Sequence, residues 1–235
     1  MAGKWIVFGG WSLPATMLLP LFGSESIYID VNDHFLALAQ KEKLIERWPA
    51  ILHDAVKEIA AGPGACIAGW STGAFFAYSM AGLLHPRRLA LLSASLSFCT
   101  RGEFHFGQEC SALKIMRRQL RRNKTAVLKD FQKKCGLPEF CKESENYSTE
   151  ALNAGLVFLE EVDVSLLSKP LCPTTIFHGR EDAIIPYQAG EVLSKELGEQ
   201  ITIFPGGHAF FMDTNVQKTV INILDCSCRV TPKIE

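Results

Sequence analysis

The fold is decided by residues 65–78, Ala65-Cys-Ile-Ala-Gly69-Trp-Ser71-Thr-Gly73-Ala-Phe-Phe-Ala-Tyr78, in which an apolar strand runs through Gly-x-Ser-x-Gly directly into a helix. Such a turn is strained and lifts the serine hydroxyl clear of the sheet, and it leaves no room for side chains at Gly69 and Gly73. A serine attacks a carbonyl only when a base takes its proton and donors stabilise the oxyanion. The motif nominates Ser71 as a nucleophile. Alone it is not decisive, because a small-residue turn can also be purely structural.

The partners of such a serine follow it in a fixed order, first an acid and then a histidine, each at the end of a late strand. The β-rich run Pro173–His178 is followed by a turn that would present Asp182 at a strand's carboxyl end. A second run, Gln200–Phe204, ends in Pro-Gly-Gly-His208. Asp182 would hold the imidazole of His208 in the tautomer that accepts the Ser71 proton. Three matches in the right order predict a catalytic triad.

Other acids and histidines leave alternatives open. Glu181 is next to Asp182 and could replace it, although the Gly-x-x-Asp turn favours Asp182. His178 lies inside an apolar strand and is expected to be a core or pocket histidine rather than a base. The remaining histidines have no motif around them and are expected to be surface or hydrogen-bonded residues: His34, His53, His85 and His105.

The oxyanion requires two backbone N–H donors. One belongs to the residue after the nucleophile, Thr72, and the other to the loop after the first core strand. Lys4–Phe8 has the composition of that strand, and Gly9-Gly10-Trp11 follows it. Because glycines let the backbone approach a substrate closely, Trp11 is predicted to be the second donor. The alternative is that the two glycines form an ordinary tight turn.

Composition is that of one soluble α/β domain with an insertion. The chain has 235 residues, 48% of them hydrophobic, and a net charge of −1. These values give no overall signal for binding nucleic acid or a membrane.

The eight cysteines are scattered, and a secreted disulfide framework usually belongs to a smaller chain. Cys226 and Cys228 have no second pair at zinc-like spacing, so free thiols are expected. The apolar stretch Trp5–Phe22 resembles a signal peptide, but Gly, Pro and Ser interrupt it, and it already contains the first strand and the oxyanion loop. We therefore expect a reducing, cytoplasmic compartment.

Strand and helix patterns alternate along the chain, which predicts a mostly parallel sheet of about six strands with helices on both faces. The predicted strands are Lys4–Phe8, Ile27–Val31, Ala65–Trp70, Leu89–Ser93, Pro173–His178 and Gln200–Phe204, and the predicted helices are Leu38–Ala60, Thr72–Leu84, Pro186–Leu197 and Asp213–Leu224. Between Leu92 and Pro170 helical patterns replace strand patterns. This stretch predicts a helical cap, residues 99–169, inserted into a core made of residues 1–98 and 170–235.

The predicted cap carries a concentrated positive charge. Nine basic residues and one acid lie between Lys114 and Lys134. Two pairs four residues apart share helical faces, and they comprise Arg117, Arg118, Arg121 and Arg122. Long charge runs are most often solvated helix faces. Solvated faces usually mix signs, however, so an acidic or phosphorylated partner is an equally good interpretation.

The motifs together resemble one family of α/β-hydrolases, the pimeloyl-[acyl-carrier protein] methyl ester esterases. The resemblance rests on Gly69-Trp-Ser-Thr-Gly73, Gly10-Trp11, Leu152-Asn-Ala-Gly-Leu156 followed by Val162-Asp163, and the final Gly-Gly-His208. It implies hydrolysis of the methyl ester of a pimeloyl chain carried on acyl-carrier protein, in biotin precursor synthesis, with no metal and no cofactor. It also implies that basic cap residues bind the acidic carrier.

The chain departs from that family at three places. Gly9 stands where the family has histidine, the sequence begins directly at the strand before the oxyanion loop, and the basic cap residues occur earlier. Two other functions stay open: another carboxylesterase or an acyl-carrier thioesterase with the same triad, and a binding protein of this fold that has lost its chemistry. Aromatic residues that could line an acyl channel are Phe104, Phe106, Phe131, Phe140 and Phe158.

Overall fold

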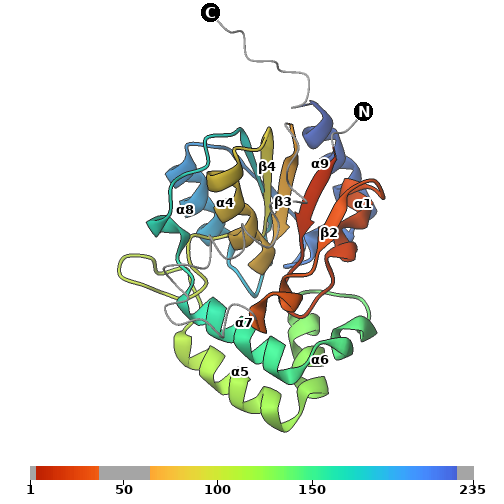
Figure 1. Cartoon of the computed structure of the whole chain (residues 1–235), viewed down its shortest axis with the longest axis vertical. Helices are drawn as coiled ribbons and strands as arrows, with labels where there is room; N and C mark the ends of the chain where they lie inside the picture. The colour runs from red at the N-terminus through yellow and green to blue at the C-terminus, as the bar shows by residue number, and fades with distance from the viewer. Residues whose placement is uncertain (1–3, 37–63, 227–235) are drawn as a thin grey trace, which may run out of the picture.

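A six-stranded, entirely parallel sheet forms the centre of the protein, as a computed structural model describing residues 4–36 and 64–226 shows (Figure 1). The strands are β1 (Trp5–Phe8), β2 (Ile27–Ile29), β3 (Cys66–Trp70), β4 (Arg88–Leu92), β5 (Thr174–Gly179) and β6 (Ile201–Phe204). Their order in the sheet is β2-β1-β3-β4-β5-β6. Each predicted strand is confirmed to within two residues at either end.

Helices cover both faces of the sheet. On one face lie α4 (Thr72–Leu84) and α8 (Tyr187–Leu197), and on the other lie α1 (Leu19–Phe22) and α9 (Thr214–Cys226) (Figure 1). Short 3₁₀ helices are η1 (Ala15–Leu18), η2 (Val31–Asp33), η3 (Lys142–Asn146), η4 (Val164–Leu166) and η5 (Phe210–Met212). Helix α4 begins and ends where the sequence predicts. The predicted helix Leu38–Ala60 lies outside the described residues.

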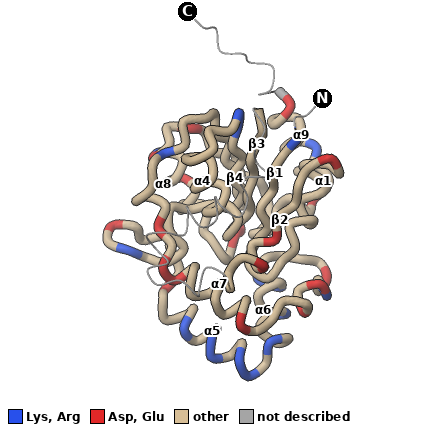
Figure 2. Tube along the Cα trace, viewed as in Figure 1, with Lys and Arg blue, Asp and Glu red and all other residues tan. Residues whose placement is uncertain are grey.

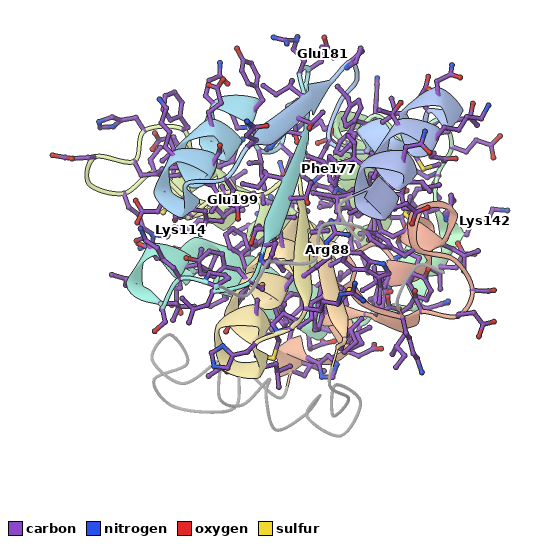
Figure 3. All side chains as sticks on the ribbon, turned by 90° about the horizontal axis from the view of Figure 1, so that it is seen from above. Arg88, Lys114, Lys142, Phe177, Glu181 and Glu199 are labelled. Atoms are coloured by element: carbon purple, nitrogen blue, oxygen red, sulfur yellow. The ribbon has the colours of Figure 1, made fainter. Side chains whose placement is uncertain are left out.

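The core lies on both sides of the central strands. Every residue of β1, β3 and β4 is buried, because each of these strands is covered on both faces. Phe177 of β5 is fully buried in the interior, between the two helical layers (Figure 3). Arg88 is also buried and donates a hydrogen bond to the Leu224 carbonyl, so its charge serves the packing of α9 against the sheet.

Three helices form the insertion between β4 and β5: α5 (Cys110–Arg122), α6 (Lys124–Lys134) and α7 (Thr149–Glu161). They lie together beyond the end of the sheet that is opposite the α9 end Cys226 (Figure 1). Asn123 accepts a hydrogen bond from the Ala126 amide at 3.0 Å and thereby caps α6. The predicted fold class, an α/β-hydrolase fold with inserted cap helices, is confirmed. In the described part of the chain, no helix is long and apolar enough to span a bilayer.

Candidate active site

Ser71 occupies a strained turn between β3 and α4. Its backbone has φ 57° and ψ −119°, a conformation that residues with a side chain rarely adopt. A Cβ atom at Gly69 would lie 2.1 Å from the Gly73 carbonyl oxygen, and one at Gly73 would lie 2.3 Å from the Phe8 carbonyl oxygen. The two glycines of the motif are therefore required by direct backbone contact.

His208 and Asp182 form a hydrogen-bonded pair at the carboxyl end of the sheet. His208 Nδ1 lies 2.7 Å from Asp182 Oδ2. Asp182 follows β5 and His208 follows β6, so two neighbouring parallel strands bring them together. A Cβ atom at Gly179 would lie 2.1 Å from the Gly207 carbonyl oxygen, which shows how closely the two loops pack.

Four contacts surround the Asp182 carboxylate. Oδ1 accepts hydrogen bonds from the amides of Ile184 at 2.8 Å and Ile185 at 2.9 Å. Oδ2 contacts His208 and, at 3.3 Å, Nε2 of His178. Burial raises the pKa of Asp182. The charge of His208 and the contacts from both histidines lower this pKa by more than burial raises it, so the pKa lies below its ordinary value. Asp182 is therefore ionised at neutral pH.

His178 also contacts Asp182, although the sequence analysis predicted only that it is a core or pocket histidine. It is fully buried, and its Nε2 lies 2.8 Å from the Ile185 carbonyl oxygen. Since a carbonyl can only accept, Nε2 carries the proton, and the same N–H faces Asp182. His178 therefore supports the acid rather than acting as a base.

The backbone of His208 is fixed from the sheet side. Its carbonyl accepts hydrogen bonds from Trp70 Nε1 and Ser93 Oγ, each at 3.0 Å. The indole of Trp70 also packs on the imidazole, with ring centroids 5.4 Å apart. Because Trp70 directly precedes Ser71, this contact brings histidine and serine to the same end of the sheet. His208 Nε2 is buried and has no hydrogen-bond partner within residues 4–36 and 64–226.

The loop after β1 lies beside the serine. A Cβ atom at Gly10 would be 3.7 Å from Ser71 Cβ, so the Gly10–Trp11 peptide lies alongside Ser71. Thr72 is the first residue of α4 and is buried. At Gly9 a Cβ atom would lie 2.8 Å from the Ala15 backbone, so this loop has no space for a side chain at that position.

Glu181, the alternative acid, points elsewhere. Its carboxylate accepts a hydrogen bond from the Gly206 amide, and the residue is exposed. Figure 3 shows Glu181 at the edge of the molecule, whereas Asp182 is 7% exposed. Among the other histidines, His85 and His105 are exposed, and His34 is partly buried with its pKa lowered by that burial. His53 lies outside the described residues.

The four arginines of the basic segment do not share one environment. Arg117 faces α7, with its guanidinium 3.2 Å from the Glu160 carboxylate and 3.2 Å from Asn153 Oδ1. Arg118, Arg121 and Arg122 are exposed and have no ion pair within the described part of the chain. Lys and Arg recur along α5, at the end of the molecule away from α9 (Figure 2).

A cavity of about 860 Å³ lies between α5, α6 and the loop after Asp182. Its wall is mainly apolar and includes Leu113, Met116, Val127, Phe131 and Ile184, and its charged lining residues are Arg122, Asp130 and Lys134. Phe131 also packs edge-on against Trp11, with centroids 4.9 Å apart. The cavity is thus one side chain away from the loop after β1. Phe158 instead packs in the core, against Phe35 and Phe76.

The described thiols and carboxylates form no group suited to hold a metal ion. Six cysteines are free thiols: Cys66, Cys99, Cys110, Cys135, Cys141 and Cys172. Within the residues described, no three His, Cys, Asp or Glu side chains are grouped so that they could hold a metal ion. The side chain of Cys226 and the whole of Cys228 lie outside the described part.

Comparisons with solved structures show the fold. An esterase from Exiguobacterium antarcticum superposes with a TM-score of 0.75 at 16% identity and covers 95% of this chain and 92% of its own. A bromoperoxidase from Bacillus anthracis gives a TM-score of 0.70 at 14% identity, covering 96% and 92%. At such identities the likeness concerns architecture alone.

Comparisons with curated sequences are more specific, although no family model matches the chain. The pimeloyl-[acyl-carrier protein] methyl ester esterase of Xylella fastidiosa strain M23 is 30% identical over 190 residues, which are 73% of this chain and 74% of that protein. The esterase of the same name from Nitrosomonas europaea is 28% identical over 164 residues, 62% of this chain and 65% of its own. The chain therefore belongs to the pimeloyl-[acyl-carrier protein] methyl ester esterase family of α/β-hydrolase enzymes.

Proposed function

We propose that this protein is a serine carboxylesterase that hydrolyses the methyl ester of pimeloyl-acyl-carrier protein, in biotin precursor synthesis. The observation that carries the proposal is the buried His208–Asp182 pair, 2.7 Å apart, at the sheet edge where the strained Ser71 turn lies. The ionised carboxylate orients the imidazole, and the buried Nε2 is left to serve the serine. A protein that only binds its ligand does not need this arrangement.

The proposed reaction has two halves. His208 takes the Ser71 proton while Ser71 Oγ attacks the ester carbonyl, and the amides of Thr72 and Trp11 bind the oxyanion. The C–O bond to the methoxy group breaks, and methanol leaves with the proton from His208. Water then gives a proton to His208 and attacks the serine ester; the C–O bond to Ser71 breaks, and His208 returns the proton to Ser71 Oγ, which releases the free carboxylic acid and restores the enzyme.

The carrier is proposed to dock on the outer side of α5. Arg118, Arg121 and Arg122 present three exposed charges there, and an acidic carrier supplies the opposite sign. Arg117 contributes indirectly, because its contact with Glu160 holds α5 against α7.

The cavity between α5 and α6 adds a place for the carrier's flexible arm and acyl chain. Its apolar wall suits methylene groups, and Arg122 belongs both to its lining and to the exposed basic face. We assign residues 99–169 to a cap unit on this basis, and residues 1–98 and 170–235 to the catalytic core. The free thiols agree with a reducing, cytoplasmic compartment.

The test compares two methyl esters, methyl pimelate free in solution and the same group carried on acyl-carrier protein. The proposal predicts a much higher kcat/KM for the carrier-bound ester, and a fall of that value with added salt that the free ester does not show. Equal values for the two substrates would point to a small-molecule carboxylesterase. Cleavage of the thioester instead of the methyl ester, detected by release of the acyl chain from the carrier, would make the enzyme a thioesterase.

A further inference from the structure

Asn32 is fully buried and contacts both sides of the oxyanion residue Trp11. It lies in η2, directly after β2. Its Oδ1 accepts a hydrogen bond from the Ser12 amide at 2.9 Å, and its Nδ2 donates to the Gly10 carbonyl at 3.2 Å. One carboxamide therefore holds the peptide groups before and after Trp11.

The contact with Gly10 determines where the Trp11 amide points. The Gly10 carbonyl and the Trp11 N–H belong to one planar peptide unit, in which they point in opposite directions. Fixing the carbonyl toward Asn32 therefore directs the N–H away from Asn32. The same peptide lies alongside Ser71, as the 3.7 Å approach of a Gly10 Cβ atom to Ser71 Cβ shows.

The indole of Trp11 is fixed independently. Its Nε1 donates to the Leu152 carbonyl of α7 at 2.9 Å, and Phe131 of α6 packs on its ring. At Gly155 a Cβ atom would lie 2.7 Å from Trp11 Cδ1, so the helix is open there to receive the ring. The Gly10 carbonyl also accepts a hydrogen bond from the Leu13 amide at 3.4 Å, longer than the 3.2 Å bond from Asn32. Because two consecutive glycines do little to resist rotation of the Gly10–Trp11 peptide, its orientation depends on these two contacts, of which Asn32 makes the shorter.

We propose that Asn32 is a positioning residue for the oxyanion hole, holding the Gly10–Trp11 peptide with its N–H toward the reacting carbonyl. This inference rests on the proposed serine esterase function. It also explains why a polar side chain is fully buried next to the site, since both of its polar atoms are used by the loop.

Two variants of Asn32 test the assignment. Asn32→Asp keeps the shape and the acceptor for Ser12 but places an oxygen against the Gly10 carbonyl, and Asn32→Ala removes both hydrogen bonds without adding charge. For each, kcat per titratable Ser71 is expected to fall about 10²–10³-fold, the effect of losing one oxyanion donor, while KM changes less than about threefold. Endpoint titration of Ser71 with a fluorophosphonate counts only folded enzyme, so partial misfolding does not imitate this result.

A tetrahedral inhibitor supplies the second measurement. Binding of a trifluoromethyl ketone, which forms an oxyanion on Ser71, is expected to weaken in proportion to kcat/KM. The matched control is Asn153→Asp, on a partly exposed asparagine that contacts Arg117, and its activity is expected to stay within about twofold of wild type. Wild-type kcat and wild-type ketone affinity in both Asn32 variants would overturn the assignment, and so would a loss confined to KM. Full activity of Ser71→Ala, measured in parallel, would instead overturn the proposed function.

Discussion

The loops around Ser71 and the outer face of α5 are held in different ways. At the Ser71 turn, the backbone of Gly69 packs directly against the Gly73 carbonyl. In the neighbouring loops that carry Asp182 and His208, the backbone of Gly179 packs against the Gly207 carbonyl, and neither place has space for a side chain. On the outer face of α5, Arg118, Arg121 and Arg122 extend into solvent without ion-pair partners in the described part of the chain.

The difference separates chemistry from recognition. A site made of close backbone contacts has one geometry, so its chemistry is fixed before a substrate arrives. A face made of exposed long side chains can adopt many geometries, and its contribution to binding depends on the charge of the partner and on the salt concentration. Changes in the first region should therefore affect every substrate equally, whereas changes in the second should affect only a charged partner.

The largest expected effect follows removal of the nucleophile. Ser71→Ala should lower kcat by about 10⁴ or more for both free and carrier-bound esters, because no other group can form the serine ester. The substitution removes one oxygen from the turn, so the thermal unfolding midpoint should change little. Loss of the folded state, seen by circular dichroism, would mean that the hydroxyl is needed for structure instead.

The acid should come next. Asp182→Asn is expected to cut kcat by about 10²–10⁴, because an amide cannot hold His208 in the required tautomer. Glu181→Gln is the matched control, and its activity should stay within about twofold, since the exposed Glu181 carboxylate accepts a hydrogen bond from the Gly206 amide whereas His208 pairs with Asp182. Steady-state kinetics on a short ester compare them, and a reversal of the two effects would show that the acid is Glu181.

A smaller effect, confined to one substrate, should follow charge reversal on α5. Changing Arg118, Arg121 and Arg122 to Glu should lower kcat/KM for the carrier-bound ester by about tenfold or more and leave the short free ester unchanged. Reversal of three exposed lysines on the core changes the net charge equally and serves as control: Lys4, Lys195 and Lys218. Equal loss with both triple variants would show that net charge matters rather than this face.

The smallest expected effect concerns stability at low pH. The pKa of Asp182 is lowered by folding, so its ionisation stabilises the fold above the ordinary value of 3.8, and this contribution is lost as the pH falls further below that value. Urea unfolding of wild type and Asp182→Asn should therefore show a constant difference in unfolding free energy above about pH 5 that decreases toward pH 3. A difference that grows on acidification would contradict the direction of the pKa shift.

The sequence predicted the fold and the backbone-built part of the site for one physical reason. Backbone contacts leave no room for a Cβ atom at Gly69 or Gly73. Only glycine fits at these two positions, so the motif can be recognised in the sequence alone. The predicted second strand, Ile27–Val31, is shorter in the structure and ends at Ile29, because Val31 begins η2. That early end places Asn32 against the loop after β1.

Contacts between distant segments could not be predicted in the same way. Asn32 reaches Gly10, and Trp11 reaches Leu152, through tertiary packing that no local pattern records. One signal was present, a glycine inside the predicted helical segment at Gly155, since a glycine there weakens a helix and implies close packing. The pairing of Arg117 with Glu160 likewise depends on how α5 meets α7.

The central claim is that Ser71 is the nucleophile of a working triad, and intact-mass analysis after treatment with a fluorophosphonate tests it most directly. The account predicts a single adduct on wild-type protein, located at Ser71, no adduct on Ser71→Ala, and slow labelling of Asp182→Asn. An unlabelled wild-type protein, or an adduct that persists in Ser71→Ala, would contradict it.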